Sequence, residues 1–205
     1  MSVSSLTRFT VPLASDQSAS NQGLLMPKLG FRFRVSFENF GVTTPRSELT
    51  KQIATFKRPS STTPDKTIDV YNSKIYYQGK PEWSTGECTL RDDASGNVAR
   101  LVGEQLQKQF DFMEQSSAAS GIDYKYITRF EVLDGANGIH EPVVLETWEY
   151  YGCFITATSW GDGDYSNDDP MMIGLTWRAD NCLQIPLENG VGAPVPRTTG
   201  DVLTG

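Results

Sequence analysis

The side chains that could perform acid–base or metal chemistry are few in this sequence and poorly spaced. His140 is the only histidine and lies in the loop-like segment GANGIHEP, which excludes a metal site of several histidines and weakens every histidine-based catalytic arrangement. Glu146 and Glu149 are three residues apart in a strand-like segment, so their side chains point to opposite faces. The sequence therefore predicts a solvated loop histidine and no converging pair of carboxylates for glycoside hydrolysis.

An acidic segment, GDGDYSNDD, is a candidate for binding a cation, because calcium favours flexible, oxygen-rich loops. Its oxygen-bearing side chains are those of Asp162, Asp164, Asn167, Asp168 and Asp169. The match to an EF-hand loop fails, since the sixth position is Asn167 where glycine is needed and the twelfth is Ile173 where glutamate is needed. Gly and Asp also form turns, so a solvated turn is the favoured interpretation and no metal site is predicted.

Motifs for covalent catalysis or for phosphate binding are absent from the sequence. None of GxSxG, GxxxxGK[ST] and GxGxxG occurs. Cys88, Cys153 and Cys182 are odd in number, far apart and outside CxxC spacing, which favours buried, reduced thiols over a disulfide framework or a zinc site. We therefore expect no enzyme activity and no cofactor, and a role in binding or structure.

Charge is distributed unevenly along the 205 residues, whose formal net charge is -7. Residues 1–58 carry 8 basic and 3 acidic side chains, residues 59–152 carry 8 and 15, and residues 153–205 carry 2 and 7. The acidic balance disfavours tight binding to nucleic acid, whose phosphates are held mainly by clustered Lys and Arg. No apolar run is long enough for a signal sequence or a membrane span, so we expect synthesis in a cytoplasm and no membrane insertion.

Period-two alternation predicts most of the secondary structure. Residues 29–37 form the clearest strand, and further strands are expected at 48–56, 68–77, 83–90, 125–133, 143–159 and 171–179, with a possible break at Gly152. After the cluster DDASGN, apolar residues recur at spacings of 3 to 4 and predict one amphipathic helix ending near residues 116–121. The fold class expected is a mainly β, antiparallel sandwich or barrel with one packed helix.

The predicted core combines the apolar face of the first strand with the helix stripe and two tryptophans. Its members are Phe31, Phe33, Val35, Phe37, Leu101, Leu106, Phe110, Trp148 and Trp177. Residues 1–27 and 183–205 are polar or Pro-rich and read as an N-terminal arm and a C-terminal tail around a domain at 28–182. The strands within Lys66–Asp93 are too polar to be buried on both faces, so we expect neighbouring copies of the chain to pair their edges.

In the order of these elements, the chain resembles the tube protein of contractile bacteriophage tails, a family related to the tube proteins of type VI secretion and of R-type pyocins. The resemblance covers about residues 28–182 and depends on the order of its elements more than on any single motif. Its carriers are FRFRVSF, then Lys74, Ile75, Gly79 and Trp83 before Thr89, Leu90, Asp92 and Asp93, then Trp148, Glu149, Gly152 and Cys153 in ETWEYYGCFI, and finally LTWRAD. The long arm, the acidic loop at 161–170 and the Pro-rich tail depart from the compact members of the family.

The resemblance implies hexameric rings stacked head to tail into a tube inside a contractile sheath. Each subunit would lend about four strands to an inner barrel that runs around the ring. About 24 strands spaced about 4.8 Å apart and tilted about 35 to 45° would leave a channel roughly 35 to 42 Å wide, enough for a DNA duplex about 20 Å across. The implied partners are further copies of the chain, the sheath, and the tape measure, baseplate and terminator proteins, and the implied location is the virion, after assembly in the host cytoplasm.

Two surfaces of such a tube can be assigned residues from the sequence. Strand alternation suggests Glu48, Asp69 and Glu146 as lumen-facing carboxylates that repel DNA towards the axis. Arg46, Lys57 and Arg58, in the basic first third, are expected to meet the acidic face of the next ring. The alternatives are an initiator or terminator ring of the tail, a type VI secretion tube, or an enzyme on a β-sandwich scaffold.

Overall fold

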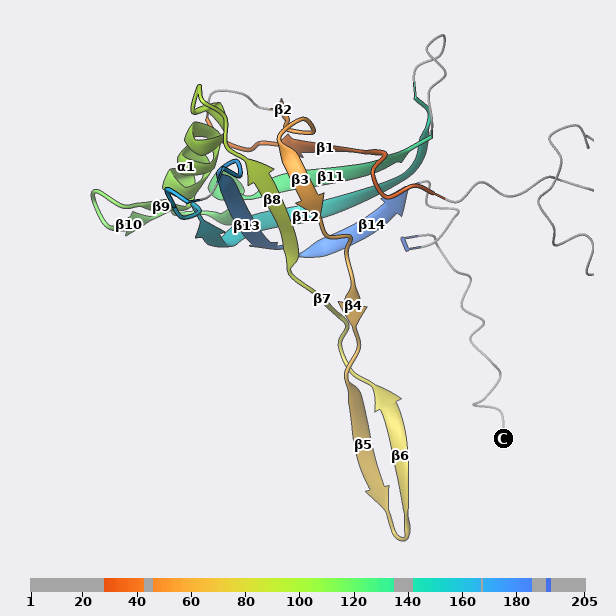
Figure 1. Ribbon diagram of the computed structural model, residues 1–205. Helices are drawn as coiled ribbons and strands as arrows, with labels where there is room; N and C mark the ends of the chain where they lie inside the picture. Colours follow the sequence, from red (N-terminus) through yellow and green to blue (C-terminus); the bar gives the residue numbers. More distant parts are fainter. Residues whose placement is uncertain (1–27, 43–45, 135–141, 167, 186–190, 193–205) are drawn as a thin grey trace, which may run out of the picture.

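The computed structural model describes residues 28–42, 46–134, 142–166, 168–185 and 191–192. The mainly β, antiparallel fold with a packed helix, predicted from the period-two pattern, is confirmed. Its described strands form an open arrangement with two sheet ends (Figure 1), so one chain does not close a barrel by itself. No helix in the described ranges has the length and apolar character needed to cross a membrane.

One sheet holds the N- and C-terminal strands of the domain, with antiparallel neighbours throughout. Its order is β2 (Arg46–Glu48), β1 (Phe33–Glu38), β11 (Tyr126–Leu133), β12 (Val144–Ser159) and β14 (Asn181–Ile185). Strand β14 was not predicted, and it continues past residue 182, where the sequence suggested that the tail begins. The strand expected at 48–56 is divided, because backbone bonds from Gln52 and Ile53 to the Leu49 carbonyl make a turn between β2 and β3.

A second sheet of four strands continues from the same long strand β12. Its order is β12, β13 (Met172–Arg178), β8 (Gly86–Arg91) and β3 (Ile53–Phe56). The sequence analysis allowed for a break in this strand at Gly152. In the structure β12 is continuous there, but its neighbouring strand changes. Strand β12 pairs with β11 up to Cys153 and with β13 from Phe154 onwards. Gly152, just before this change of partner, has a φ of 66° that favours glycine.

The core lies where the inward faces of the two sheets meet. Alternation along β11 is complete, with residues 126, 128, 130 and 132 buried and their neighbours half-buried. Phe130 stacks between two rings, with centroids 4.8 Å from Phe56 and 5.6 Å from Phe33. Trp177 is fully buried and lies 5.5 Å from Phe56. These aromatic contacts join β1, β3, β11 and β13 into one core.

The residues expected in the core separate into three groups. Val35, Phe37, Leu101 and Trp177 are buried, and Phe33, Leu106 and Trp148 are partly buried against the core. Phe31 and Phe110 are not core residues. Phe31 is 73% exposed because the chain turns at residues 30–31, before β1 begins at Phe33, and Phe110 is 37% exposed because the helix has already ended.

Helix α1 (Asn97–Gln109) packs one face on the core and is shorter than its apolar stripe suggested. The Asp93 carboxylate accepts the Val98 N–H at 3.2 Å near the helix start, as expected for a residue of the DDASGN cluster. Phe110 then enters the small hairpin of β9 (Phe110–Asp111) and β10 (Ser116–Ser117), followed by the short helix α2 (Gly121–Tyr124). The Gln105 amide is fully buried and joins two loops, because it accepts from Gly41 N–H at 3.0 Å and donates to the Tyr124 carbonyl at 2.7 Å.

A long hairpin stands away from the body of the molecule (Figure 1). A short neck of β4 (Ser61–Thr62) and β7 (Glu82–Trp83) leads to β5 (Asp65–Val70) and β6 (Ser73–Gln78). The sequence predicted one strand across residues 68–77, and this is wrong, because the chain turns at Tyr71. Tyr71 has a φ of 45°, a left-handed conformation that tyrosine seldom adopts, and the turn signal from the next residue, Asn72, was overlooked.

Candidate assembly surfaces

The outward face of the four-stranded sheet is covered by small side chains. The Thr55 and Thr89 hydroxyls are 3.0 Å apart across β3 and β8, and Gly174 and Thr176 continue the same face on β13. A shallow hollow on this face is lined by residues of β8, β12 and β13, among them Ala157. The face is therefore smooth and rich in hydroxyl groups.

Charges on this face are mostly paired. Lys57 Nζ lies 3.2 Å from a Glu87 oxygen, and Arg178 lies 3.5 Å from a Glu82 oxygen. Arg91 adds an exposed cation at the end of β8. Acidic side chains do not dominate this surface, although they dominate the sequence as a whole.

The two edges of the four-stranded sheet differ. Among the described residues, β3 has no strand on its outer side. On the other side, Gln109 at the end of α1 occupies the edge of β12 as a short strand would. Its amide donates to the Ile155 carbonyl at 3.0 Å and accepts the Ile155 N–H at 2.8 Å. Residues 156–159 extend beyond this amide, where the described chain provides no further strand on that side of β12.

The projecting hairpin has one apolar face. Cross-strand partners share a face, and the pair Ile68 and Ile75 lies between Val70 at the tip and Tyr77 nearer the neck. These four side chains are 51%, 54%, 43% and 51% exposed, respectively. A hairpin without a third strand or a covering layer is only marginally stable in water. The exposed face thus marks a surface for contact with another molecule.

The outward face of the other sheet is a network of ion pairs. Arg129 on β11 lies 2.7 Å from Glu149 on β12 and 3.1 Å from Glu38 on β1. Arg34 and Glu131 pair at 2.5 Å across β1 and β11. This face is polar but largely satisfied internally.

The structure places the three predicted lumen carboxylates on three different elements and brings none of them together. Glu48 belongs to β2, and Asp69 lies on the hairpin, 3.7 Å from Lys74. Glu146 is only 6% exposed, so its carboxylate does not line an open surface. Glu48 and Asp69 lie outside the four-stranded sheet, and Glu146 lies on the part of β12 that pairs with β11.

Glu146 is held by several donors inside the protein. Its carboxylate is paired with Lys28 and accepts hydrogen bonds from the Trp148 indole and, at 2.9 Å, from the Gln184 amide. Burial raises the pKa of Glu146, but the hydrogen bonds from Lys28 and Trp148 and the nearby charges of Lys28 and Arg58 together lower it below the usual value. Glu146 is therefore ionised and serves to join β12 to β14 and to the start of the domain.

Among the predicted inter-ring residues, Lys57 and Arg58 are neighbours in sequence with separate environments. Lys57 belongs to the outward face of the four-stranded sheet through its pair with Glu87. Arg58 lines a cavity of about 340 Å³ between the sheets. Arg46 is in β2, and its side chain lies outside the described residues. Lys57 and Arg58 therefore have separate environments.

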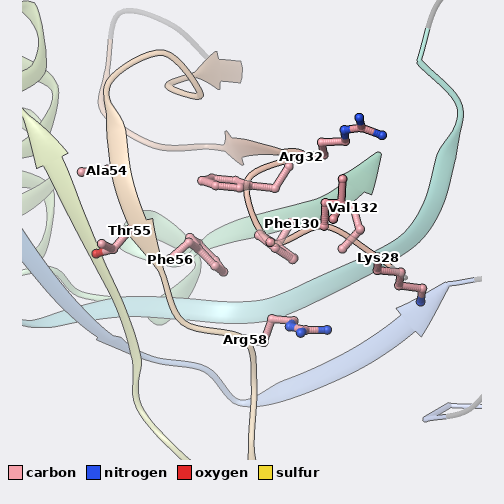
Figure 2. Close-up of a pocket in the computed structure, with 11 residues that line it drawn as sticks. Lys28, Arg32, Ala54, Thr55, Phe56, Arg58, Phe130 and Val132 are labelled. Atoms are coloured by element: carbon pink, nitrogen blue, oxygen red, sulfur yellow. The ribbon is translucent and has the colours of Figure 1, made fainter. Parts of the chain in front are cut away.

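The cavity at Arg58 was not anticipated from the sequence. Its apolar wall includes Phe56, Phe130 and Val132, and Lys28 and Arg32 join Arg58 around it (Figure 2). Its remaining lining residues are Leu29, Gly30, Phe33, Ala54 and Thr55. The alternation of aromatic and basic residues in FRFRVSF was the available signal, but the cavity also needs β3 to approach from 20 residues later in the sequence.

Groups suited to catalysis or metal binding are not assembled in the described part of the chain. Cys88, Cys153 and Cys182 are buried free thiols, as the sequence suggested. Burial raises the pKa of Cys88 and of Cys153 to about 12, so neither is a nucleophilic thiolate at neutral pH. The described acidic side chains of residues 161–169 form no cluster that could hold a metal ion.

Sequence comparison identifies no matching family model and no matching curated protein. Comparison with solved structures finds chains of similar fold. A chain of the anti-feeding prophage baseplate has a TM-score of 0.61 and 10% identity, over 80% of this chain and 99% of the other. The tube-terminating cap of the same particle has a TM-score of 0.52 and 14% identity, over 79% of this chain and 93% of the other. A sheath/tube terminator of the PVC extracellular contractile injection system also has a TM-score of 0.52 and 14% identity, over 79% of this chain and 99% of the other.

These likenesses show a shared fold, since the identities are too low to carry more. The similarity spans nearly the whole of each compared chain and about four fifths of this one. The resemblance predicted from FRFRVSF, ETWEYYGCFI and LTWRAD is thereby confirmed at the level of architecture. The chain shares its fold with baseplate and tube-terminating chains of contractile injection systems.

Proposed function

We propose that this chain is a structural subunit of a phage tail tube, in which hexameric rings stack inside a contractile sheath and conduct DNA into the host. The four-stranded sheet carries this proposal. It matches the contribution of about four strands per subunit that a closed inner wall needs, and its two sides end in β3 and in the last residues of β12. Pairing these two edges between neighbouring copies would satisfy their backbone groups and close the ring.

The smooth outward face of this sheet is the proposed channel wall. Thr89, Gly174 and Thr176 present little bulk and no net charge, and the Lys57–Glu87 pair is neutral. DNA would slide along such a wall because clustered cations, which hold phosphates, are absent from its described residues. The wall proposed here therefore differs from an acidic one built from Glu48, Asp69 and Glu146.

The projecting hairpin is the proposed contact between copies. Its apolar face, formed by Ile68, Val70, Ile75 and Tyr77, is half-exposed in the single chain and would be buried on a neighbour. A hairpin on one surface and a receiving face elsewhere make a heterologous interface, which does not close on itself. Such an interface allows rings to stack into a filament.

The second candidate is a ring that begins or ends the tube. The fold likenesses at a TM-score above 0.5 described above are to a baseplate chain and to two terminators, which favours this alternative at the level of fold. The two functions differ in what purified protein should form. A tube protein elongates into stacked rings of variable length, whereas an initiator or terminator stops at a discrete hexamer.

Electron microscopy of purified full-length protein with and without an intact hairpin face tests the proposal. Ile68→Lys with Ile75→Glu should abolish stacked assemblies while the circular dichroism and thermal unfolding of the subunit stay unchanged, because these residues contact solvent in the single chain and opposite charges keep the two strands paired. Thr67→Lys is the matched control, since Thr67 lies on the opposite hairpin face, and it should assemble normally. Assembly by the double variant at wild-type concentrations would contradict the role given to the hairpin.

A further inference from the structure

The cavity at the open end of the sandwich combines an aromatic wall with three basic side chains, those of Lys28, Arg32 and Arg58. Lys28 is paired with Glu146, and the charge of Arg58 also acts on that carboxylate. Phe56 and Phe130 are stacked with their ring planes 11° apart and form part of the wall. Arg32 lies over the Phe31 ring at 5.5 Å, and in the described part of the chain neither Arg32 nor Arg58 forms an ion pair with a carboxylate. Such a cavity suits a group that carries both an aromatic ring and a negative charge.

The chain presents such a group at the opposite end of the molecule. In the acidic loop of residues 161–170, Tyr165 is fully exposed, and Asp162 and Asp164 are also exposed. Hydrogen bonds from the backbone and hydroxyl of Ser166 lower the pKa of Asp164, so this carboxylate is ionised at neutral pH. The loop thus offers a ring flanked by carboxylates, with no core contact of its own to satisfy the ring.

The loop of one chain lies far from the Val132 end of its own cavity. The cavity includes Val132, which pairs with Glu146 near the start of β12, whereas the loop begins after Ser159 at the end of that strand. The 13 residues between them span about 40 Å of extended strand, and β12 crosses the whole body (Figure 1). A loop of this size reaches at most about 17 Å from its two ends, which is too short for the Val132 end of the cavity. The β3 wall is nearer, because Ile53 is in register with Leu90 and Ile173, so a second copy is favoured by the far wall and by the charges.

We propose that the acidic loop of one copy docks in the cationic aromatic cavity of a neighbouring copy, with Tyr165 against Phe56 and Phe130 and its carboxylates facing Arg32 and Arg58. The inference rests on the proposed tube function and adds the identity of one interface. Donor and acceptor lie at opposite ends of the chain, so the contact is head to tail and can repeat around a ring or along a stack. The charges are complementary, which favours correct pairing of copies over other encounters.

Cysteine cross-linking in the full-length protein tests this contact without removing any of the interacting side chains. Ala54→Cys places a thiol in the cavity lining, and Gly163→Cys places one in the loop, where an added Cβ meets nothing within 4 Å. Mixing the two singly substituted proteins under assembly conditions should give a disulfide-linked heterodimer. The native cysteines are buried, so the unsubstituted protein should show no cross-link.

The matched control replaces the cavity thiol with one on the helix. Gly103→Cys lies in α1 with open space around its added Cβ, and mixed with Gly163→Cys it should cross-link at least about tenfold less, because a docked pair has a far higher effective concentration. Adding Arg58→Glu to the Ala54→Cys protein should reduce the specific cross-link by a similar factor.

Electron microscopy of the same samples distinguishes a failure of the docking contact from a failure of the tube function. Rings or tubes that form without the specific cross-link would overturn the docking contact and leave the tube function standing. Protein that stays monomeric at all concentrations would overturn the tube function and this contact with it.

Discussion

At the scale of single residues, glycine positions report how closely the core is packed. A Cβ on Gly86 would collide with the indole of Trp177, which is fully buried. Gly86→Ala should therefore destabilise the subunit by about 1–3 kcal/mol through overpacking. Gly103→Ala is the control, because its Cβ would meet open space in the middle of α1, and it should stabilise by about 0.5–1 kcal/mol. Chemical denaturation of both variants measures the difference, and a neutral Gly86→Ala would contradict the packing described here.

The lowered pKa of Glu146 predicts how the free energy of unfolding depends on pH. Its folded pKa is lowered, so the stability it contributes is present above the ordinary carboxyl pKa of about 4.3 and is lost as pH falls through the lower folded value. Glu146→Gln should reduce the difference in unfolding free energy between pH 6 and pH 3, as measured by denaturation at both values. Lys28→Met, which removes the paired cation, should flatten the dependence in the same direction. If both variants kept the wild-type pH dependence, Glu146 would not be the group responsible.

Residue identity alone could not place this carboxylate. Glu146 follows a strand pattern that suggested an outward position, yet its partners Lys28 and Gln184 come from the two ends of the domain. Only the folded order of strands brings them together. The three cysteines were easier to predict, because a thiol outside any motif is most often buried in the core.

At the scale of elements, the join between α1 and the edge of β12 makes a specific prediction. Gln109→Ala would leave the N–H and carbonyl of Ile155, a buried residue, without their present partners, and should cost about 1–3 kcal/mol. Gln107→Ala removes an exposed amide from the same helix, whose hydrogen bond from the Phe112 N–H is long at 3.5 Å and exposed, so it should cost less than Gln109→Ala. Equal effects of the two substitutions in thermal or chemical unfolding would show that Gln109 does not close this edge.

The elements that could be predicted are those half-buried on the core. Strands β11, β12 and β13 alternate because one face is apolar and the other polar, so their residue ranges follow closely from the sequence. The hairpin of β5 and β6 was misread as a single strand because both of its faces are exposed in one chain, and Asn72 was the one turn-forming residue between Tyr71 and the next strand. Helix α1 was predicted too long because Phe110 continues the apolar spacing into β9.

At the scale of the whole molecule, the proposed function depends on what a single chain leaves incomplete. The four-stranded sheet ends in β3 and in the last residues of β12, and the hairpin exposes an apolar face. The cavity at Arg58 is lined by three basic side chains, of which Lys28 is paired with Glu146. A sequence read residue by residue could suggest association but could not assign these surfaces, because each is formed by segments distant in the chain. The inter-ring contacts of Arg46, Lys57 and Arg58 remain a prediction. Of these three residues, only Arg58 lines the cavity that is proposed above as a docking site.

Cryo-electron microscopy of the assembled full-length protein, at a resolution that separates strands, tests the proposed tube most directly. We expect a closed hexameric wall in which β3 of one copy lies beside the C-terminal residues of β12 of the next, with Thr89 and Thr176 facing an open axial channel. Particles in which these two edges face solvent, or in which this sheet faces away from the axis, would contradict the proposed tube.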